Sequence, residues 1–170
     1  MSRSTGAPFR ILVLCTGNSA RSQIAEALIS VRGAARAAGL VTAASAGSRP
    51  SARVNPFAIA TLAAHGIEWR DRAPKSIDDL GGEEFNLVIT VCDNARDACP
   101  FYPGAAAQVH WGMPDPADET DPVWAAAAFA ATYDALAQRV DELLALPLES
   151  LPSDELRDWA SAIHSQMGLR

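Results

Sequence analysis

Eight consecutive residues, from Cys15 to Ser22, have the residue types of an oxyanion site. They follow an apolar, strand-like stretch (11–14) and lead into a helix-like stretch (23–29), so loop and first-turn N–H groups should converge on one spot. Cys15 supplies a nucleophile at one end, and Arg21 supplies a two-pronged cation at the other. The spacing predicts a site for a tetrahedral oxyanion the size of phosphate. The candidate binding residues are Thr16, Gly17, Asn18, Ser19, Ala20, Arg21 and Ser22.

Cys15 should react as a thiolate, because the positive end of a helix and Arg21 both favour a negative sulfur. Ser22 could donate a hydrogen bond to that thiolate. Gly17 and Asn18 are residue types that tolerate the positive φ of a tightly curled loop. The alternative interpretation is an inert, buried cysteine at the end of a strand.

Two further thiols follow a later strand. Cys92 comes directly after the apolar stretch 87–91, and Cys99 stands seven residues further on. The carboxyl ends of parallel strands share one edge of a sheet, so Cys92 would overlook Cys15 if their strands were neighbours. In a helix, Cys92 and Cys99 would lie about 10.5 Å apart along the axis, beyond the Cα separation of about 7 Å that a disulfide allows. The spacing hints at a redox-dependent unwinding; two unrelated free thiols are the alternative.

Asp115 is the candidate general acid. It lies between Pro114 and Pro116, which stiffen the loop after a fourth expected strand. A carboxyl group held there could protonate a leaving oxygen. The alternative is a turn residue with a solvated side chain. The neighbouring acids are expected to be surface charge: Asp118, Glu119 and Asp121.

The pattern of elements predicts an α/β fold. Continuous apolar strands alternate with helices, which favours a parallel sheet covered on both faces. The strands are expected at 9–15, 41–46, 87–91 and 109–111, and the helices at 21–38, 56–65, 76–80, 121–146 and 153–167. Val123 and Phe129 should belong to the apolar face of the fourth helix, and Leu156, Trp159 and Ile163 to that of the last.

One domain over 1–170 is expected, with 1–8 as a loose tail and 148–170 as a C-terminal helical extension. That extension should pack on the domain surface; a contact between copies in an oligomer is the alternative. The apolar fraction is 49% and the net charge −6, so nothing suggests nucleic acid or an anionic membrane as partner. No signal peptide and no membrane span is expected. Three cysteines without an export signal favour a cytoplasmic location.

Three groups of residues together resemble the thioredoxin-coupled arsenate reductases, which share the fold of low-molecular-weight tyrosine phosphatases. The groups are Cys15 to Ser22, Cys92 with Cys99-Pro100, and His110-Trp111-Gly112 with Asp115-Pro116. The likeness runs over roughly residues 9–145. It implies a three-layer fold with a four-stranded parallel sheet of order 2-1-3-4.

The resemblance also implies a mechanism for arsenic detoxification. Cys15 attacks arsenate, Arg21 and the loop amides bind it, and Asp115 acts as the acid. Cys92 then attacks Cys15 and releases arsenite, and Cys99 takes over the disulfide, which thioredoxin reduces. Phosphate would compete for the site, and a weak phosphatase side activity is expected. No cofactor is expected. Glutaredoxin or a small thiol remains an alternative electron donor.

The chain departs from this family in three places. Residues 148–170 extend beyond the usual end of the family. Ala20 stands where many relatives carry another cysteine, and little effect is expected. Some relatives bind potassium behind the loop, at positions that resemble Asn18, Glu26 and Ser45 and a fourth at about Lys75. An ammonium group at that fourth position could replace the ion, so no metal is predicted.

A phosphatase is the main rival, because it would use Cys15, Arg21 and Asp115 without the other thiols. Phosphatases of this fold tend to carry aromatic residues beside the Asp-Pro pair, whereas Ala117-Asp118-Glu119 follows here. That favours the reductase. A non-enzymatic module that senses an anion or acts as a scaffold is the third possibility.

Overall fold

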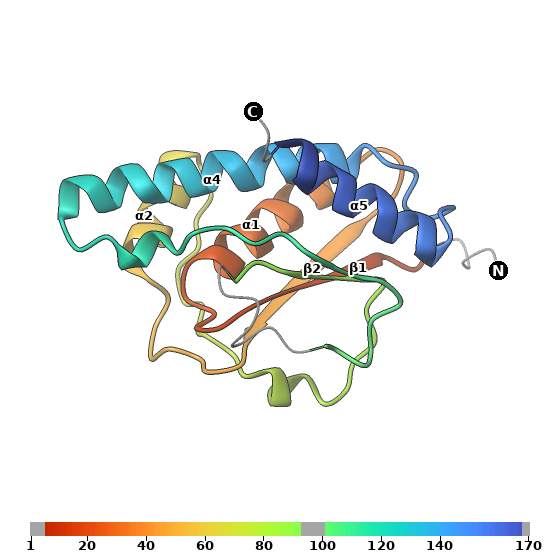
Figure 1. The fold of residues 1–170 in the computed structure, drawn as a ribbon, viewed down its shortest axis with the longest axis horizontal. Helices are drawn as coiled ribbons and strands as arrows, with labels where there is room; N and C mark the ends of the chain where they lie inside the picture. The colour runs from red at the N-terminus through yellow and green to blue at the C-terminus, as the bar shows by residue number, and fades with distance from the viewer. Residues whose placement is uncertain (1–5, 93–100, 168–170) are drawn as a thin grey trace.

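The computed structural model describes residues 6–92 and 101–167. Its core is a sheet of four parallel strands, in the order β2-β1-β3-β4 (Figure 1). The strands are β1 (Phe9–Cys15), β2 (Val41–Gly47), β3 (Leu87–Thr90) and β4 (Gln108–His110). The predicted parallel sheet and its strand order are confirmed.

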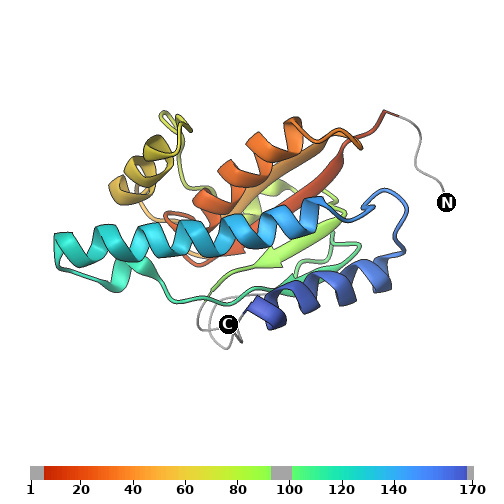
Figure 2. The ribbon, with the colours of Figure 1, turned by 90° about the horizontal axis from the view of Figure 1, so that it is seen from above.

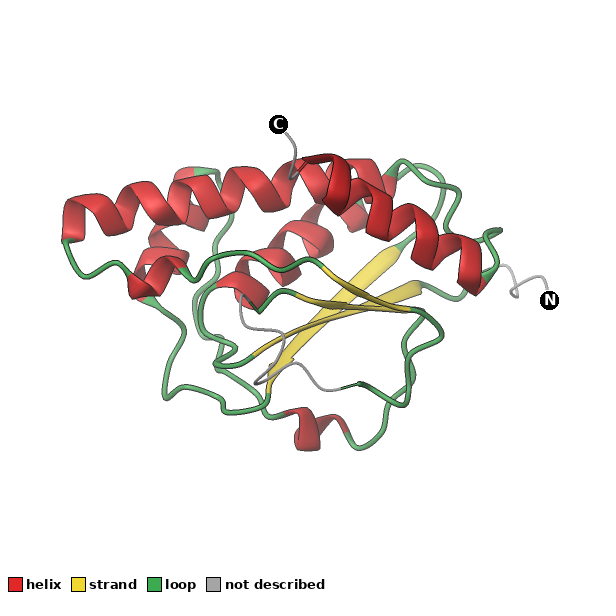
Figure 3. Cartoon of the chain, viewed as in Figure 1, coloured by secondary structure: helices red, strands yellow, loops and turns green. Residues whose placement is uncertain are grey.

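Helices cover the sheet on both faces, as predicted. The α-helices α1, α4 and α5 lie on one side, and the short 3₁₀ helix η1 lies on the opposite side (Figure 3). Seen from above, α4 runs between α1 and α5 (Figure 2). The helices are α1 (Arg21–Ala34), α2 (Pro56–Ala64), η1 (Ile77–Leu80), η2 (Pro116–Asp118), α4 (Pro122–Leu144) and α5 (Ser153–Met167).

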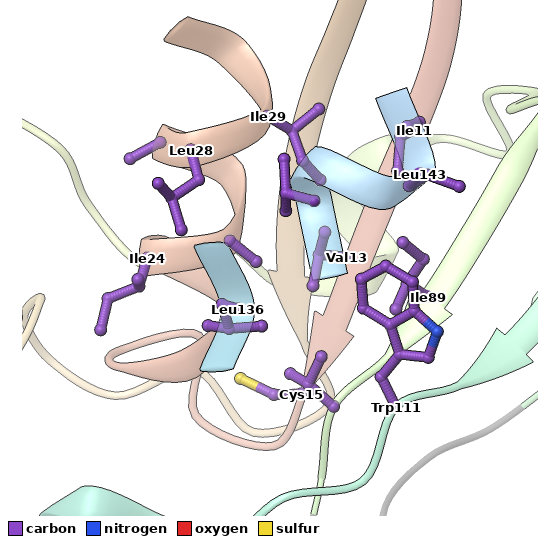
Figure 4. Packing of buried hydrophobic residues seen from close by; sticks show 14 of the residues in the cluster. Ile11, Val13, Cys15, Ile24, Leu28, Ile29, Ile89, Trp111, Leu136 and Leu143 are labelled. Carbon is purple, nitrogen blue, oxygen red and sulfur yellow. The ribbon is translucent and has the colours of Figure 1, made fainter. Parts of the chain in front are cut away.

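The alternation of side chains along β1 divides the core between the two faces. Ile11 and Val13 point into the larger apolar cluster, beside α1 and α4 (Figure 4), and α5 adds buried side chains to the same cluster. Leu12 and Leu14 point into the smaller cluster, to which η1 contributes Leu80. Because every β1 side chain from Ile11 to Leu14 is buried on one face or the other, the strand reads as a continuous apolar run. β1 is thereby fixed on both sides where it leads into the candidate loop.

Helix α1 ends at Ala34, so the predicted end at residue 38 is wrong. Past that point the chain turns, and the Arg36 guanidinium donates to the carbonyl oxygens of Leu144 and Leu146 at 2.8 and 2.9 Å. It also pairs with Glu149. These carbonyls lie at and just beyond the end of α4, where a helix leaves acceptors unpaired. The helix therefore ends just before Arg36, the residue that makes these tertiary contacts.

The predicted helix over the C-terminal extension is confirmed as α5, but its apolar face is narrower than expected. Leu156, Ala160 and Ile163 are buried, whereas Trp159 is 54% exposed. Trp159 lies beside the stripe that faces the domain, not on it. The Trp111 indole donates to the Ala160 carbonyl oxygen at 2.9 Å, which ties α5 to the segment after β4.

On α4, Phe129 is buried as expected, but Val123 is 76% exposed in the first turn. Val123 was therefore wrongly assigned to the apolar face. The α-helices of the described part of the chain include none long and apolar enough to cross a membrane.

Candidate active site

The loop after β1 has the backbone geometry of an anion site. Ala20 is the N-cap residue of α1, and among the described residues no side chain caps the first N–H groups of this helix. Asn18 has a φ of 49°, in the left-handed region that asparagine tolerates better than most residues. The Asn18 N–H points at the Cys15 Sγ, 3.2 Å away. The Asn18 N–H therefore points into the loop, and binding of an anion by the loop amides stays a prediction.

A second segment holds the loop from outside. N–H groups of residues 48–55 donate to the outward carbonyl oxygens of Cys15, Thr16, Gly17 and Ser19 at 2.9 to 3.3 Å. Gly47, at the end of β2, permits this close approach, because a Cβ there would lie 2.4 Å from the Thr16 carbonyl oxygen. With their carbonyls engaged outward, the peptide units of the loop can present N–H groups inward.

The thiol of Cys15 is 3% exposed and lies where β1 turns into the loop (Figure 4). Its sulfur is 2.8 Å from the Ser22 hydroxyl. The Ser22 oxygen also accepts a hydrogen bond from the Asn18 side-chain amide at 2.8 Å. The same amide donates to the Ser45 hydroxyl, and Ser45 donates in turn to the Glu26 carboxylate, each at 2.8 Å.

The directions of these hydrogen bonds follow from the donors available. The Asn18 Oδ1 accepts from the backbone N–H of Lys75 and from the Gln23 side chain at 2.8 and 3.2 Å, which fixes the amide orientation. The two amide hydrogens are then donated to the Ser22 and Ser45 oxygens, one to each. Ser22 accepts from Asn18, and either the Ser22 hydroxyl or the Cys15 thiol can be the donor of the hydrogen bond between them; when Cys15 is a thiolate, the hydroxyl donates. A hydrogen bond donated to the sulfur favours the thiolate.

The donor set behind the loop does not suit a potassium ion. Such an ion would need free oxygens, but those of Asn18 already accept N–H donors, and Glu26 is engaged twice. The Glu26 carboxylate is buried and pairs with the Arg72 guanidinium at 3.4 Å. Arg72 therefore supplies the cation beside Glu26, and Lys75 contributes its backbone N–H instead.

Arg21 is buried at the start of α1, as its predicted role requires. One guanidinium nitrogen donates to the carbonyl oxygens of Met113 and Val91 at 2.9 and 3.4 Å. Another lies 3.3 Å from the Asp115 carboxylate. The Nε is buried and has no hydrogen-bond partner among the described residues. An unpaired buried donor is costly, and an anion bound in the loop would relieve that cost.

Asp115 is brought to the site by its pairing with Arg21, and it also accepts from the Ala117 N–H at 3.0 Å as the N-cap of η2. Its side chain is 32% exposed, so it is neither buried nor a freely solvated turn residue. Its acidic neighbours Asp118, Glu119 and Asp121 are exposed, as predicted, and the Asp121 carboxylate also caps the N–H groups of Val123 and Trp124 at the start of α4.

The second predicted thiol lies on the neighbouring strand. Leu14 of β1 pairs with Thr90 of β3, so Cys15 and Cys92 both come within two residues of the last paired position. Cys92 is 2% exposed and belongs to the same buried cluster as Cys15. It is disulfide-bonded, whereas Cys15 is a free thiol. Cys99, and with it the predicted unwinding of the segment between the two cysteines, lies outside the described residues.

Three side chains that contribute to the site were not found from the sequence. The Gln23 amide donates to Asn18, and the Trp69 indole donates to the Gln23 carbonyl oxygen at 2.8 Å. The Arg72 guanidinium lies 3.9 Å over the Trp69 ring. Trp69 and Arg72 come from the polar segment before η1, which carries no motif, so their role follows only from tertiary contacts.

Comparison with known proteins agrees with this geometry. A model of the family described as low molecular weight phosphotyrosine protein phosphatase matches residues 10–156. An arsenate reductase of Bacillus cereus is 38% identical over 109 residues, which are 64% of this chain and 78% of the relative. A solved arsenate reductase in a phosphate-binding state superposes with a TM-score of 0.68 and 25% identity, over 81% of this chain and 97% of that one.

A thioredoxin-dependent arsenate reductase of Corynebacterium glutamicum is also similar, with a TM-score of 0.62 and 27% identity, over 82% of this chain and 61% of the other. The family model covers most of the chain and includes the whole of the loop, both strand ends and Asp115. The chain belongs to the low molecular weight phosphotyrosine protein phosphatase family.

Proposed function

We propose that this protein reduces arsenate to arsenite through a three-cysteine relay, with Cys15 as nucleophile, Cys92 as resolving thiol and Cys99 as the residue that passes the disulfide to thioredoxin. One observation carries the proposal most strongly. A free, buried thiol that hydrogen-bonds to the Asn18 N–H and to the Ser22 hydroxyl lies in a loop that curls as an anion-binding loop does, and a second cysteine follows the adjacent strand. The names of the similar proteins supply the substrate class.

Arsenate binding is assigned to the loop amides and to Arg21. The first-turn N–H groups of α1 and the amides of residues 16–20 would surround the oxyanion. The unpaired Arg21 Nε and the guanidinium nitrogen beside Asp115 would form the fork that contacts two of its oxygens. Phosphate, which has the same shape and charge, would compete.

The first chemical step joins sulfur to arsenic. The Cys15 thiolate attacks arsenate, an S–As bond forms, and one oxygen leaves as water after it has been protonated. Asp115 is the proposed proton donor, because its carboxyl group lies beside the guanidinium that would hold the anion. Ser22 would stabilise the attacking sulfur through the hydrogen bond described above.

The second step transfers two electrons to arsenic. The Cys92 thiolate attacks the Cys15 sulfur, the S–As bond breaks with its electron pair kept by arsenic, and arsenite leaves. Cys99 then attacks Cys92, which frees Cys15 and leaves a Cys92–Cys99 disulfide. Thioredoxin would reduce that disulfide by thiol–disulfide exchange. The sum is arsenate and two thiols giving arsenite, a disulfide and water. The need for reduced thiols favours the cytoplasm.

The rival activity is the hydrolysis of phosphate monoesters through a phosphorylated Cys15. It needs the same loop, Arg21 and Asp115, and the family model that matches is named for it. It has no use for Cys92 or Cys99. We therefore assign it a minor, side-activity role.

Two assays on one preparation separate the reductase, the phosphatase and an inert anion-binding module. The first follows arsenate-dependent NADPH oxidation with thioredoxin and thioredoxin reductase, and the second follows hydrolysis of p-nitrophenyl phosphate. We expect turnover in the first that is lost in Cys92→Ser, and only slow hydrolysis in the second. Fast hydrolysis that survives Cys92→Ser, without arsenate turnover, would establish the phosphatase.

A further inference from the structure

The buried carboxylate of Glu26 plays no part in the chemistry proposed above, yet it ends the hydrogen-bond chain that begins at the Cys15 sulfur. The chain runs through Ser22, Asn18 and Ser45, with each link at 2.8 Å. An ionised Glu26 can only accept, so it fixes the direction in which Ser45 donates. That direction leaves the Ser45 oxygen free to accept from Asn18, which is the arrangement the thiolate needs.

A buried carboxylate needs a compensating charge, and here that charge comes from Arg72. The Glu26 side chain is 6% exposed, and the Arg72 guanidinium lies 3.4 Å from its second oxygen. The guanidinium is also stacked over the Trp69 ring, which is itself buried and tied to the loop through Gln23. The Trp69 ring therefore holds one face of the Arg72 guanidinium, and the Glu26 carboxylate holds its edge.

We propose that Arg72 is a positioning residue for the Cys15 thiolate, acting through Glu26, and that it makes the loop independent of any monovalent metal ion. Its guanidinium pairs with the Glu26 carboxylate and so holds in place the acceptor at the end of the hydrogen-bond chain. An ion is not needed behind this loop, because the oxygens that would bind it are engaged by protein donors. This role concerns the reactivity of Cys15, so it can be tested without arsenate reduction. Only the measurement of turnover rests on the proposed function.

The test measures Cys15 reactivity with iodoacetamide under reducing conditions in a Cys92→Ser, Cys99→Ser background, so arsenate reduction is not required. Arg72→Ala should lower the alkylation rate at pH 7 several-fold and by no more than about tenfold, because loss of one hydrogen bond to a charged group is the upper limit for an indirect effect. Arg72→Lys should recover part of this rate. Arg70→Ala is the matched control, because Arg70 contacts only the exposed Glu68, at 3.9 Å; it should react like the parent.

A double-mutant cycle shows whether Arg72 acts through Glu26. Arg72→Ala should have less than a twofold effect once Glu26→Gln is present, because the shared carboxylate is gone. When Arg72→Ala is the only change in the protein, the kcat for arsenate reduction with thioredoxin should fall by a larger factor than that by which KM changes. An unchanged alkylation rate in Arg72→Ala, full additivity with Glu26→Gln, or a parent rate that rises when potassium replaces choline would each overturn the proposal. Loss of turnover with normal alkylation would instead count against the proposed reductase function.

Discussion

Replacement of Ser22 by alanine isolates the contribution of one hydroxyl to the reactivity of Cys15. The hydroxyl is fully buried, lies 2.8 Å from the sulfur, accepts from Asn18, and is the donor to the sulfur when Cys15 is a thiolate. Ser22→Ala removes this donor and leaves the Asn18 N–H, at 3.2 Å, on the sulfur. The fold should persist, because the change removes a single oxygen from the first turn of α1.

The size of the effect follows from the charge on the acceptor. A hydrogen bond to a charged group contributes about 1.5 to 3 kcal/mol, which corresponds to a thiolate population roughly 10- to 150-fold smaller without it. The less stabilised sulfur is intrinsically more nucleophilic, with a Brønsted coefficient of about 0.4–0.5. The two effects combine to a net fall of roughly 3- to 20-fold in the alkylation rate at a pH where the thiol is mostly protonated.

The assay is iodoacetamide alkylation of Cys15 at several pH values, in a Cys92→Ser, Cys99→Ser background. Thr61→Val is the control, since it removes a hydroxyl that bonds the Phe57 carbonyl oxygen on α2, far from the thiol along the chain. The control should alkylate at the parent rate. A Ser22→Ala rate equal to the parent would show that the hydroxyl does not donate to the sulfur, and the proposed hydrogen-bond directions would be wrong.

Three further predictions concern the anion, the acid and pH. Arg21→Lys should lower kcat/KM for arsenate by about 10²-fold or more, and should weaken the protection of Cys15 by phosphate, because the fork is lost; near-normal values would make Arg21 structural. Asp115→Asn should cost about 10²–10⁴ in turnover and leave phosphate protection intact, and a larger loss in Asp118→Asn would show that the wrong acid was chosen. Burial, and next the Arg139 guanidinium, lower the pKa of His164 below its usual 6.5. Its stabilising contribution is therefore present above about pH 6.5 and declines as the pH falls below that value. The urea midpoint should drop less between pH 7.5 and 5.5 in His164→Gln than in the wild type, and equal drops would contradict this.

The parts of the site that lie together in the sequence could be predicted from it. The strand, loop and helix around Cys15 to Ser22 form one continuous segment, so residue type and spacing carry the information. The pairing of β1 with β3 was implied by the family resemblance and not by the local pattern. Given that pairing, the geometry of a parallel sheet places Cys92 near Cys15.

The parts that depend on distant contacts could not be predicted. Arg72 reaches Glu26 across 46 residues, and nothing in its neighbourhood distinguishes it from the exposed Arg70. The early end of α1 has the same kind of cause, because Arg36 bonds to groups that follow it by more than 100 residues. Trp159 has the spacing of a buried residue, and only the packed position of α5 shows that it is exposed. Tertiary contacts determine these three features, and the spacing of apolar residues along the sequence carries no information about such contacts.

The relay is tested most directly by one turnover of the Cys99→Ser protein. Reduced enzyme is mixed with stoichiometric arsenate in the absence of thioredoxin, quenched in acid with an alkylating agent, and digested for mass spectrometry. The account predicts one equivalent of arsenite and a peptide pair joined by a Cys15–Cys92 disulfide, with no sustained turnover when thioredoxin is added. Arsenite formed without this disulfide, or steady turnover with thioredoxin in Cys99→Ser, would contradict the relay.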